Sequence, residues 1–204
     1  MTLRRLQMCA DRINKKYSDY TLMDAGCRTM DLKPMLKGCK AYYGSDLIAG
    51  EGVLECNLEE KLPFEDGQFD IVTALDVLEH LNNPHGALAE LCRIARRAVY
   101  VSLPNMFYIQ FRMNFLLGKG ISGKYKFHKD PVLDRHRWVM SYDETIDFIY
   151  HNCRDYTVDH EPILPARGRT KLIMEPLEKA LFKVSPNMFA YGSLFEITMD
   201  APRG

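Results

Sequence analysis

The chain has 204 residues, of which 47% are hydrophobic and 26% are charged, and its 27 lysines and arginines balance 27 aspartates and glutamates. This length suits one domain with a buried core, and the neutral balance gives no bulk field to attract nucleic acid or an anionic membrane. No apolar run is long enough for an export signal or a transmembrane segment, so we expect a cytoplasmic protein. The six cysteines form no CxxC pair and are expected to be free thiols.

A helix is the first predicted element, over residues 3–17. Its apolar side chains recur at helical spacing along one face: Leu6, Cys9, Ala10, Ile13 and Tyr17. Short apolar runs then predict strands at residues 20–25, 41–46, 52–57, 69–75 and 97–104. Between the last two of these strands, the spacing of apolar residues predicts a helix over residues 83–96.

The remaining elements continue this alternation of strands and helices. Ser141 and Glu144 have the spacing of a capping box, so a helix is predicted to begin there. Two further strands, DYTVDHE at 155–161 and LFEITMD at 194–200, close the chain. Because the strands are apolar on both faces and alternate with helices, the sequence predicts an α/β protein with a parallel sheet.

Two segments do not fit this alternation. Residues 105–135 are rich in aromatic and basic side chains, and residues 162–190 contain prolines and a short helical patch, KLIMEPLEKALFKV. Long connections in a compact domain are often functional. We therefore expect one domain over residues 1–204, with insertions at about 105–135 and 162–190 that form a lid over an acceptor site.

The loop after the first predicted strand has features of a ligand-binding loop. Asp24 ends the strand, and Gly26 permits a tight turn and a close approach of the backbone to a ligand. Asp31 is the expected N-cap of the next helical turn, so the loop from Gly26 to Asp31 would direct free backbone N–H groups at the ligand. Asp46 ends the next strand, 22 residues after Asp24, where nucleotide-binding folds place a carboxylate that accepts the ribose hydroxyls.

Asp24-Ala25-Gly26, GSDL at 44–47 and NLEEKLPFEDGQFDIVTALDVLEHLNNP at 57–84 resemble the successive motifs of class I S-adenosylmethionine (SAM)-dependent methyltransferases, of the methyltransferase domain 11 type. HRWVMSYDE, at 136–144, resembles the family's segment before its last helix. The resemblance implies a Rossmann-like sheet of seven mostly parallel strands in the order 3-2-1-4-5-7-6, with helices on both faces and the last strand antiparallel. It also implies SAM as the cofactor and methyl transfer to an oxygen, nitrogen or carbon of a small acceptor.

The same resemblance implies a role for nine cofactor-binding residues. Asp46 would bind the ribose, and Leu47, Leu58 and Asn57 would surround the adenine. The others would face the methionine part of the cofactor. The complete set is Asp24, Gly26, Cys27, Arg28, Asp46, Leu47, Asn57, Leu58 and Leu75.

The chain departs from the family pattern in two places. Arg28 and Met30 stand where the family commonly has glycines, so we expect a less tightly wound loop and a changed cofactor affinity. The link from Asp46 to Val53 is shorter than the roughly dozen residues that a helical crossover between parallel strands needs. A turn is therefore expected there, followed by a short third strand.

Asp76, Glu79 and His80 are spaced so that they would share one face of a helix. Three interpretations stay open for them. His80 is a general base, the three residues bind a divalent metal, or they only cap the segment and make the pocket polar. Of these, His80 is kept as the candidate catalytic residue, and no metal site is assigned.

The aromatic and basic residues of 105–135 also allow three interpretations: the wall and lid of an acceptor pocket, a membrane-binding surface, or a satellite core. A lid is favoured, because no long amphipathic helix with a cationic face is evident. Aromatic rings with a few cations would suit a small, lipid-like or phosphorylated acceptor. Neutral net charge argues against RNA. The alternative to an enzyme is an inactive methyltransferase-like binding or regulatory module, which the altered residues Arg28 and Met30 would support.

Overall fold

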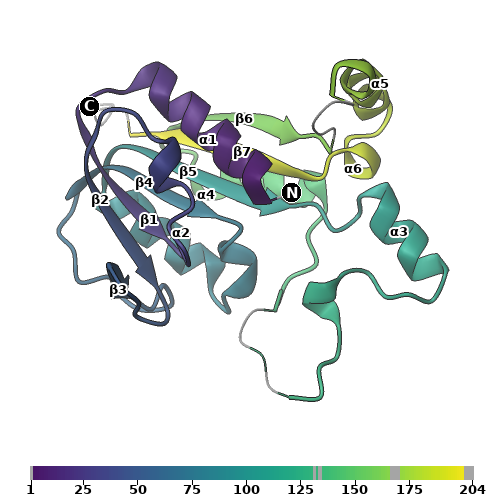
Figure 1. The fold of residues 1–204 in the computed structure, drawn as a ribbon, viewed down its shortest axis with the longest axis horizontal. Helices are drawn as coiled ribbons and strands as arrows, with labels where there is room; N and C mark the ends of the chain where they lie inside the picture. The colour runs from purple at the N-terminus through teal and green to yellow at the C-terminus, as the bar shows by residue number, and fades with distance from the viewer. Residues whose placement is uncertain (1, 131, 133–134, 166–170, 200–204) are drawn as a thin grey trace.

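A seven-stranded sheet forms the centre of the protein, in the order β3-β2-β1-β4-β5-β7-β6 (Figure 1). The computed structural model describes residues 2–130, 132, 135–165 and 171–199. Five strands are mutually parallel: β1 (Tyr20–Ala25), β2 (Cys39–Asp46), β3 (Val53–Glu55), β4 (Phe69–Leu75) and β5 (Ala95–Pro104). β7 (Gly192–Thr198) runs antiparallel to both β5 and β6 (Thr157–Ile163). The Rossmann-like fold expected from the sequence is confirmed.

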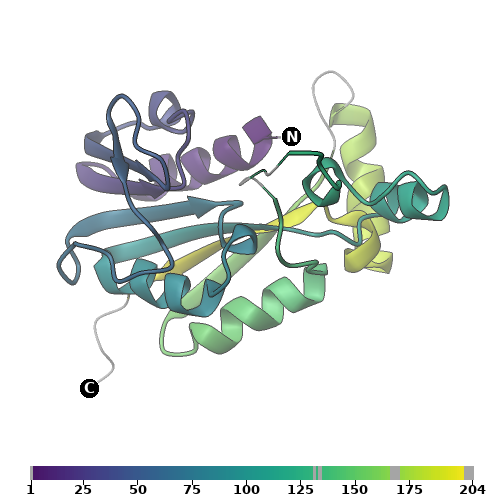
Figure 2. The same cartoon turned by 90° about the horizontal axis from the view of Figure 1, so that it is seen from below.

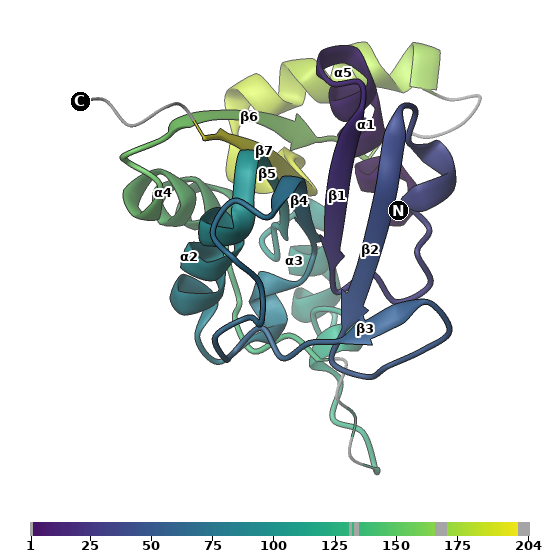
Figure 3. The same ribbon diagram turned by 90° about the vertical axis from the view of Figure 1, so that its left-hand side faces the viewer.

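Helices cover both faces of this sheet, as Figure 2 shows. α1 (Thr2–Lys16) lies on one face, whereas α2 (Pro84–Ile94) and α4 (Tyr142–Asn152) lie on the other (Figure 3). Each face has its own apolar core, because alternate side chains of a strand point to opposite faces. Leu22 packs in the core under α1, and its neighbour Met23 packs in the core under α2 and α4.

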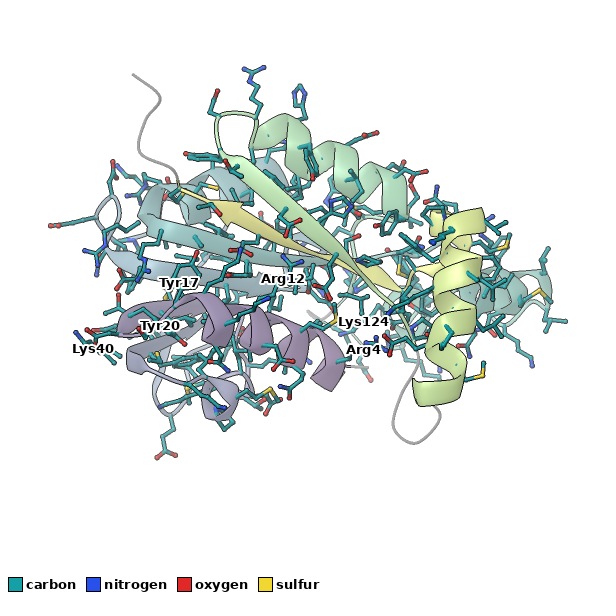
Figure 4. All side chains as sticks on the ribbon, turned by 90° about the horizontal axis from the view of Figure 1, so that it is seen from above. Arg4, Arg12, Tyr17, Tyr20, Lys40 and Lys124 are labelled. Carbon is teal, nitrogen blue, oxygen red and sulfur yellow. The ribbon has the colours of Figure 1, made fainter. Side chains whose placement is uncertain are left out.

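Ion pairs fasten α1 to the sheet. Glu196 of β7 is 1% exposed, and Lys16 of α1 approaches its carboxylate at 2.8 Å. Arg12 reaches from α1 toward β6 (Figure 4), where it pairs with Asp159 and Glu161 at 2.9 Å each. A buried carboxylate needs such partners, so these contacts fix where α1 lies on the sheet.

Some predicted elements differ in detail. The helix predicted over 83–96 ends at Ile94, and β5 begins directly at Ala95. Asp31 was expected to cap a helical turn, which is wrong: the 3₁₀ turn η1 (Lys33–Met35) has Leu32 at its N-cap and no side-chain cap. The short connection after Asp46 is a turn, closed by a bridge between Gly50 and Val53, and β3 has only three residues, as expected.

The segments between the last strands hold the remaining elements. α3 (Ile109–Leu116) and the 3₁₀ turn η3 (Gly123–Tyr125) lie between β5 and α4, and α3 projects from one end of the molecule (Figure 1). α5 (Lys171–Val184) and α6 (Pro186–Phe189) lie between β6 and β7. None of the described helices has the length and apolarity that a membrane crossing needs.

Candidate active site

A cavity of about 1100 Å³ opens at the carboxyl ends of β1, β2 and β4. Open parallel α/β sheets bind ligands at this edge. The nine residues that the resemblance assigns to the cofactor come from four separate stretches of sequence, and all nine line this one cavity, as does His80. The fold therefore brings the whole predicted set together around one space.

The loop after β1 is wound more tightly than its sequence suggested. Arg28 and Met30 have φ angles of 50° and 55°, the left-handed conformation that glycine adopts most easily. The expectation of a looser loop is therefore wrong: both residues hold the left-handed conformation despite their side chains. Gly26 has φ of 71°, and a Cβ there would lie 2.6 Å from Cγ2 of Val77, so this position requires glycine.

Most N–H groups of this loop bond to the protein itself. Gly26 and Cys27 donate to the carbonyl of Ser45 at 2.8 and 3.0 Å, and Met30 donates to the carbonyl of Cys27 at 2.9 Å. Arg28 donates to Oδ2 of Asp46 at 3.0 Å. The expected row of free N–H groups from Gly26 to Asp31 is thus wrong, because four of these six groups bond to the protein, three of them to β2.

Asp46 joins this loop to the end of β2. Besides the bond from Arg28, its Oδ1 accepts the N–H of Leu47 at 2.8 Å. A carboxylate offers about four acceptor positions, so two remain for ribose hydroxyls. The bonds already made hold the carboxylate in one orientation at the cavity wall.

Asp24 is a buried acid directly below the loop. Its side chain accepts hydrogen bonds from Thr73 Oγ1 at 2.6 Å and from the Tyr42 hydroxyl. Burial raises the pKa of Asp24 to about 6, against the lowering effect of these donors and of Arg5. Asp24 thus links β1 to β2 and β4 beneath the cavity and titrates near neutral pH.

The residues assigned to the adenine lie at the opposite end of the loop. Leu58 is buried, whereas Leu47 is 51% exposed beside the cavity. Asn57 already uses its amide: Oδ1 accepts the N–H of Glu59 at 3.1 Å, and Nδ2 donates to Glu60 at 2.7 Å. A carbonyl oxygen has two lone pairs, so one remains for an adenine amino group.

An ion pair stands at the inner end of the cavity. Arg5 of α1 approaches Oδ2 of Asp76 at 3.0 Å, and Oδ1 of Asp76 accepts the Ser102 hydroxyl at 2.6 Å. The buried Nε of Arg5 has no hydrogen-bond partner within the described residues. Sequence reasoning missed Arg5, because it lies on the first helix, far from every motif.

The segment after β4 is a 3₁₀ turn, η2 (Leu78–His80), rather than a regular helix. Asp76 precedes the turn with φ of 57° and pairs with Arg5, so the shared helical face expected for Asp76, Glu79 and His80 is wrong. Instead, Glu79 and His80 meet His136, and one ligand atom from each lies within 4.8 Å of the others. His136 belongs to the HRW segment, which was the only sequence signal for it.

Glu79 is fully buried, and neither of its carboxylate oxygens has a hydrogen-bond partner in the described part of the chain. Burial raises its pKa well above the usual range, and the nearby charge of Asp76 adds to the shift. Nε2 of His136 lies 3.7 Å and Nε2 of His80 lies 4.0 Å from Oε1 of Glu79. One carboxylate oxygen and two imidazole nitrogens form a set that could hold a divalent transition metal.

The orientation of the His80 ring follows from a backbone contact. Its Nδ1 lies 2.9 Å from the carbonyl oxygen of Arg135, so Nδ1 carries the proton in the neutral ring and Nε2 is the acceptor. Residues 136–138 are fastened to η2 as well. Arg137 donates from its N–H to the carbonyl of Glu79 and from Nε to the carbonyl of His80, at 2.9 Å each.

Comparisons with known proteins agree with this fold. Residues 17–103 match the family model described as a methyltransferase domain. Among solved structures, the small RNA methyltransferase HEN1 matches with a TM-score of 0.65 at 16% identity, over 99% of this chain and 26% of that one. The chain thus spans about a quarter of that protein. The methyltransferase domain of a bacterial Hen1 matches with a TM-score of 0.64 at 16% identity, over 97% of this chain and 99% of that one.

A third solved structure is magnesium protoporphyrin IX methyltransferase from Synechocystis PCC 6803 with bound SAH. It matches with a TM-score of 0.56 at 16% identity, over 97% of this chain and 84% of that one. No curated protein sequence matches the chain. Together, these comparisons confirm the predicted fold, and residues 17–103 are similar to a methyltransferase domain.

Proposed function

We propose that this chain, whose residues 17–103 match a methyltransferase domain, binds SAM in the cavity and transfers its methyl group to a small or amphiphilic acceptor. One observation carries the proposal: the nine residues that the resemblance assigns to the cofactor come from four sequence stretches and line a single cavity. An inactive module that had lost its cofactor would have no reason to keep this arrangement.

Each part of the cavity suits one part of the cofactor. Asp46 offers its remaining acceptor positions to the ribose, and Leu47 and Leu58 provide apolar contact for the adenine. At the inner end, Asp76 suits the ammonium group of the methionine part and Arg5 suits its carboxylate, because a guanidinium binds a carboxylate with two parallel hydrogen bonds. The cofactor supplies an electrophilic methyl group on a positively charged sulfur.

His80 is the proposed general base. Its Nε2 is the acceptor nitrogen of a ring that the Arg135 carbonyl holds in place, and the residue lines the cavity. Nε2 would take the proton of an acceptor hydroxyl or amine as its oxygen or nitrogen bonds to the methyl carbon and the bond from that carbon to the sulfur breaks. Positioning of the acceptor in line with the methyl group contributes independently of this base.

A divalent cation on Glu79, His80 and His136 is the second candidate role for this cluster. The buried carboxylate without a hydrogen-bond partner favours it, since a cation would satisfy the charge that burial otherwise disfavours. Histidines that bind a metal through one ring nitrogen usually donate a hydrogen bond from the other, which fixes the ring. The bond from Nδ1 of His80 to the carbonyl of Arg135 is of this kind. These three residues would then hold the cation next to the acceptor.

The acceptor side of the cavity combines aromatic and cationic side chains. Phe111 and Tyr191 line it with Lys124 and Arg137. Rings pack against apolar groups and cations attract phosphate or carboxylate, so an amphiphilic anion fits both. We propose such an acceptor rather than RNA, since the chain carries no excess of positive charge.

Calorimetric titration of the protein with SAM tests the first step. Binding in the micromolar range is expected, and no binding at millimolar SAM would favour the inactive module. Release of SAH is then measured with a panel of small amphiphilic anions and with short single-stranded and duplex RNA. Turnover with the amphiphilic anions is the expected result, and turnover with RNA alone would contradict the acceptor class.

A further inference from the structure

The segment between β5 and α4 presents an unusual number of apolar side chains to solvent. α3 has no buried residue along its whole length. The exposed side chains are Phe107 (39%), Met113 (46%), Phe115 (65%), Leu116 (76%), Leu117 (62%) and Phe127 (97%). We call these six residues the α3 surface. Met113, Phe115 and Leu116 belong to α3, which projects beyond the end of the sheet, as Figures 1 and 2 show.

Large exposed apolar side chains gathered in one short segment favour an interaction surface, because extensive apolar exposure is rare in proteins that stay free in water. The inner side of α3 is accounted for: Phe111 packs against the rings of Tyr108 and Tyr191, with centroids 5.9 and 5.7 Å apart. Phe115 lies one turn beyond Phe111, and Leu116 and Leu117 lie at the end of the helix; this contact leaves them 65%, 76% and 62% exposed.

The arrangement of these side chains distinguishes between kinds of partner. A helix that binds in a protein groove presents one stripe of apolar residues, three or four positions apart. Phe115, Leu116 and Leu117 are consecutive, so they point in different directions around the helix end, about 100° apart. A fluid layer of acyl chains can surround such an end on all sides, which a groove cannot.

The charged side chains of the segment are mostly positive. Residues 105–130 contain five cations, Arg112, Lys119, Lys124, Lys126 and Lys129, and one acidic residue, Asp130, in a chain whose total charge is zero. Lys126 and Lys129 are exposed next to Phe127. Apolar side chains interspersed with cations are the combination that binds anionic lipid surfaces, through insertion and through charge.

We propose that the α3 surface docks on an anionic membrane, with its apolar side chains in the interfacial layer and the neighbouring lysines at the lipid headgroups. The same segment lines the active-site cavity through Phe111 and Lys124. Docking therefore brings the cavity close to the lipid surface. The membrane contact itself needs neither cofactor nor acceptor, so it stands apart from the proposed methyl transfer.

Co-sedimentation with vesicles tests the docking in the absence of SAM. The parent protein is expected to bind vesicles of phosphatidylcholine mixed with phosphatidylglycerol, and high salt is expected to release it, because screening shortens the range of charge interactions to about 3 Å at 1 M salt. Absence of binding to these vesicles would overturn the proposal. Binding that is equally strong to pure phosphatidylcholine would also overturn it.

A double variant locates the contact. Phe115→Ser with Leu116→Ser removes two exposed side chains, so the fold should be retained, and binding to the mixed vesicles should weaken at least tenfold. The control is Leu54→Ser with Val184→Ser, which removes two exposed apolar side chains outside the segment and should leave binding unchanged. An equal loss of vesicle binding in both double variants would contradict the assignment of the membrane contact to the α3 surface.

A second copy of the chain is the alternative partner for the α3 surface, and light scattering without lipid tests it. The parent and the Phe115→Ser, Leu116→Ser variant should have the same mass in solution. A parent dimer that the variant converts to a monomer would show that the α3 surface is an interface between two copies, and would overturn the membrane assignment.

Discussion

The two walls of the active-site cavity are built differently. The wall from β1, β2 and β4 is fixed by bonds to the strands themselves: Asp46 accepts N–H groups of Arg28 and Leu47, and Gly26 donates to Ser45. The other wall comes from the described residues of 105–137. It bonds to the body at its two ends, through Asn105 and through Arg137, whereas α3 between them buries none of its residues. The strand ends thus fix the positions of the residues on the proposed cofactor side. The residues on the proposed acceptor side can differ in sequence or conformation without altering the sheet.

The first prediction tests the rigid wall. Asp46→Ala removes the proposed ribose acceptor, and hydrogen bonds to a charged partner are worth roughly 1.5–3 kcal/mol each. Because water replaces part of the carboxylate's hydrogen bonding, we expect the binding free energy of SAM to weaken by about 2–4 kcal/mol. This is a loss of about 30- to 1000-fold in SAM affinity. Calorimetric titration of parent and variant measures it directly.

Glu51→Ala provides the control for this substitution. It also removes one exposed negative charge near the end of β2, but it does not line the cavity. Its SAM affinity should match that of the parent. If Asp46→Ala also bound SAM as tightly as the parent, the carboxylate would not contact the ribose, and the cofactor assignment would lose its main residue.

The second prediction concerns the junction of the two walls, where His80 of η2 meets His136. His80→Gln should lower turnover by about a hundredfold while SAM affinity stays nearly unchanged, because loss of a general base affects the chemical step. His85→Gln is the matched control, since His85 is exposed, packs on Phe148 and lies outside the cavity. Unchanged turnover in His80→Gln would show that His80 is not a general base and that its ring has only a structural role.

Chelation separates the two roles considered for this cluster. If His80 acts as a base alone, a chelator should leave turnover unchanged. Turnover that a chelator abolishes and a divalent cation restores would instead assign Glu79, His80 and His136 to metal binding.

The third prediction uses the buried acid beneath the rigid wall. Burial raises the pKa of Asp24 from 3.8 to about 6, so the folded state holds this proton more tightly than the unfolded state does. The resulting stabilisation is complete below the lower pKa and is lost as the pH rises through about 6. Between about pH 4.5 and 7.5, this group alone should lower the free energy of unfolding by about 2 kcal/mol.

Urea denaturation of the parent and of Asp24→Asn over this pH range measures the effect. Asparagine keeps a carbonyl acceptor for Thr73 but does not titrate, and Glu79 contributes equally to both proteins. As the pH rises over this range, the free energy of unfolding of the parent should therefore fall by about 2 kcal/mol more than that of the variant. Parallel stability curves would mean that Asp24 does not titrate in this window.

The sequence predicted most of the fold and the meeting of the proposed cofactor residues at one cavity, for a physical reason. Buried strands appear as short apolar runs, and the polar residues that follow them necessarily meet at one edge of a parallel sheet. Asp24, Asp46 and Leu75 could be placed together in this way. The short β3 followed from the length of the link after Asp46.

The other features depend on contacts between distant parts of the chain. Arg5 reaches Asp76 only because α1 packs across the sheet, and His136 joins Glu79 only because the HRW segment bonds to η2. No local pattern encodes either contact. The conformation of Arg28 was also misjudged, because Asp46 and Ser45 hold the loop in a shape that its own residues do not favour.

The last prediction tests that conformation. Arg28 has φ of 50°, and the left-handed conformation costs a residue with a Cβ about 1–2 kcal/mol. Glycine avoids this cost but loses about 0.5–1 kcal/mol through the greater freedom of the unfolded chain. Arg28→Ala and Arg28→Gly both remove the side chain and differ only in the Cβ. The glycine variant should therefore be more stable than the alanine variant by about 0.5–1 kcal/mol in urea denaturation, with equal SAM affinity in both. An alanine variant as stable as the glycine variant would show that the rigid wall holds this loop without strain.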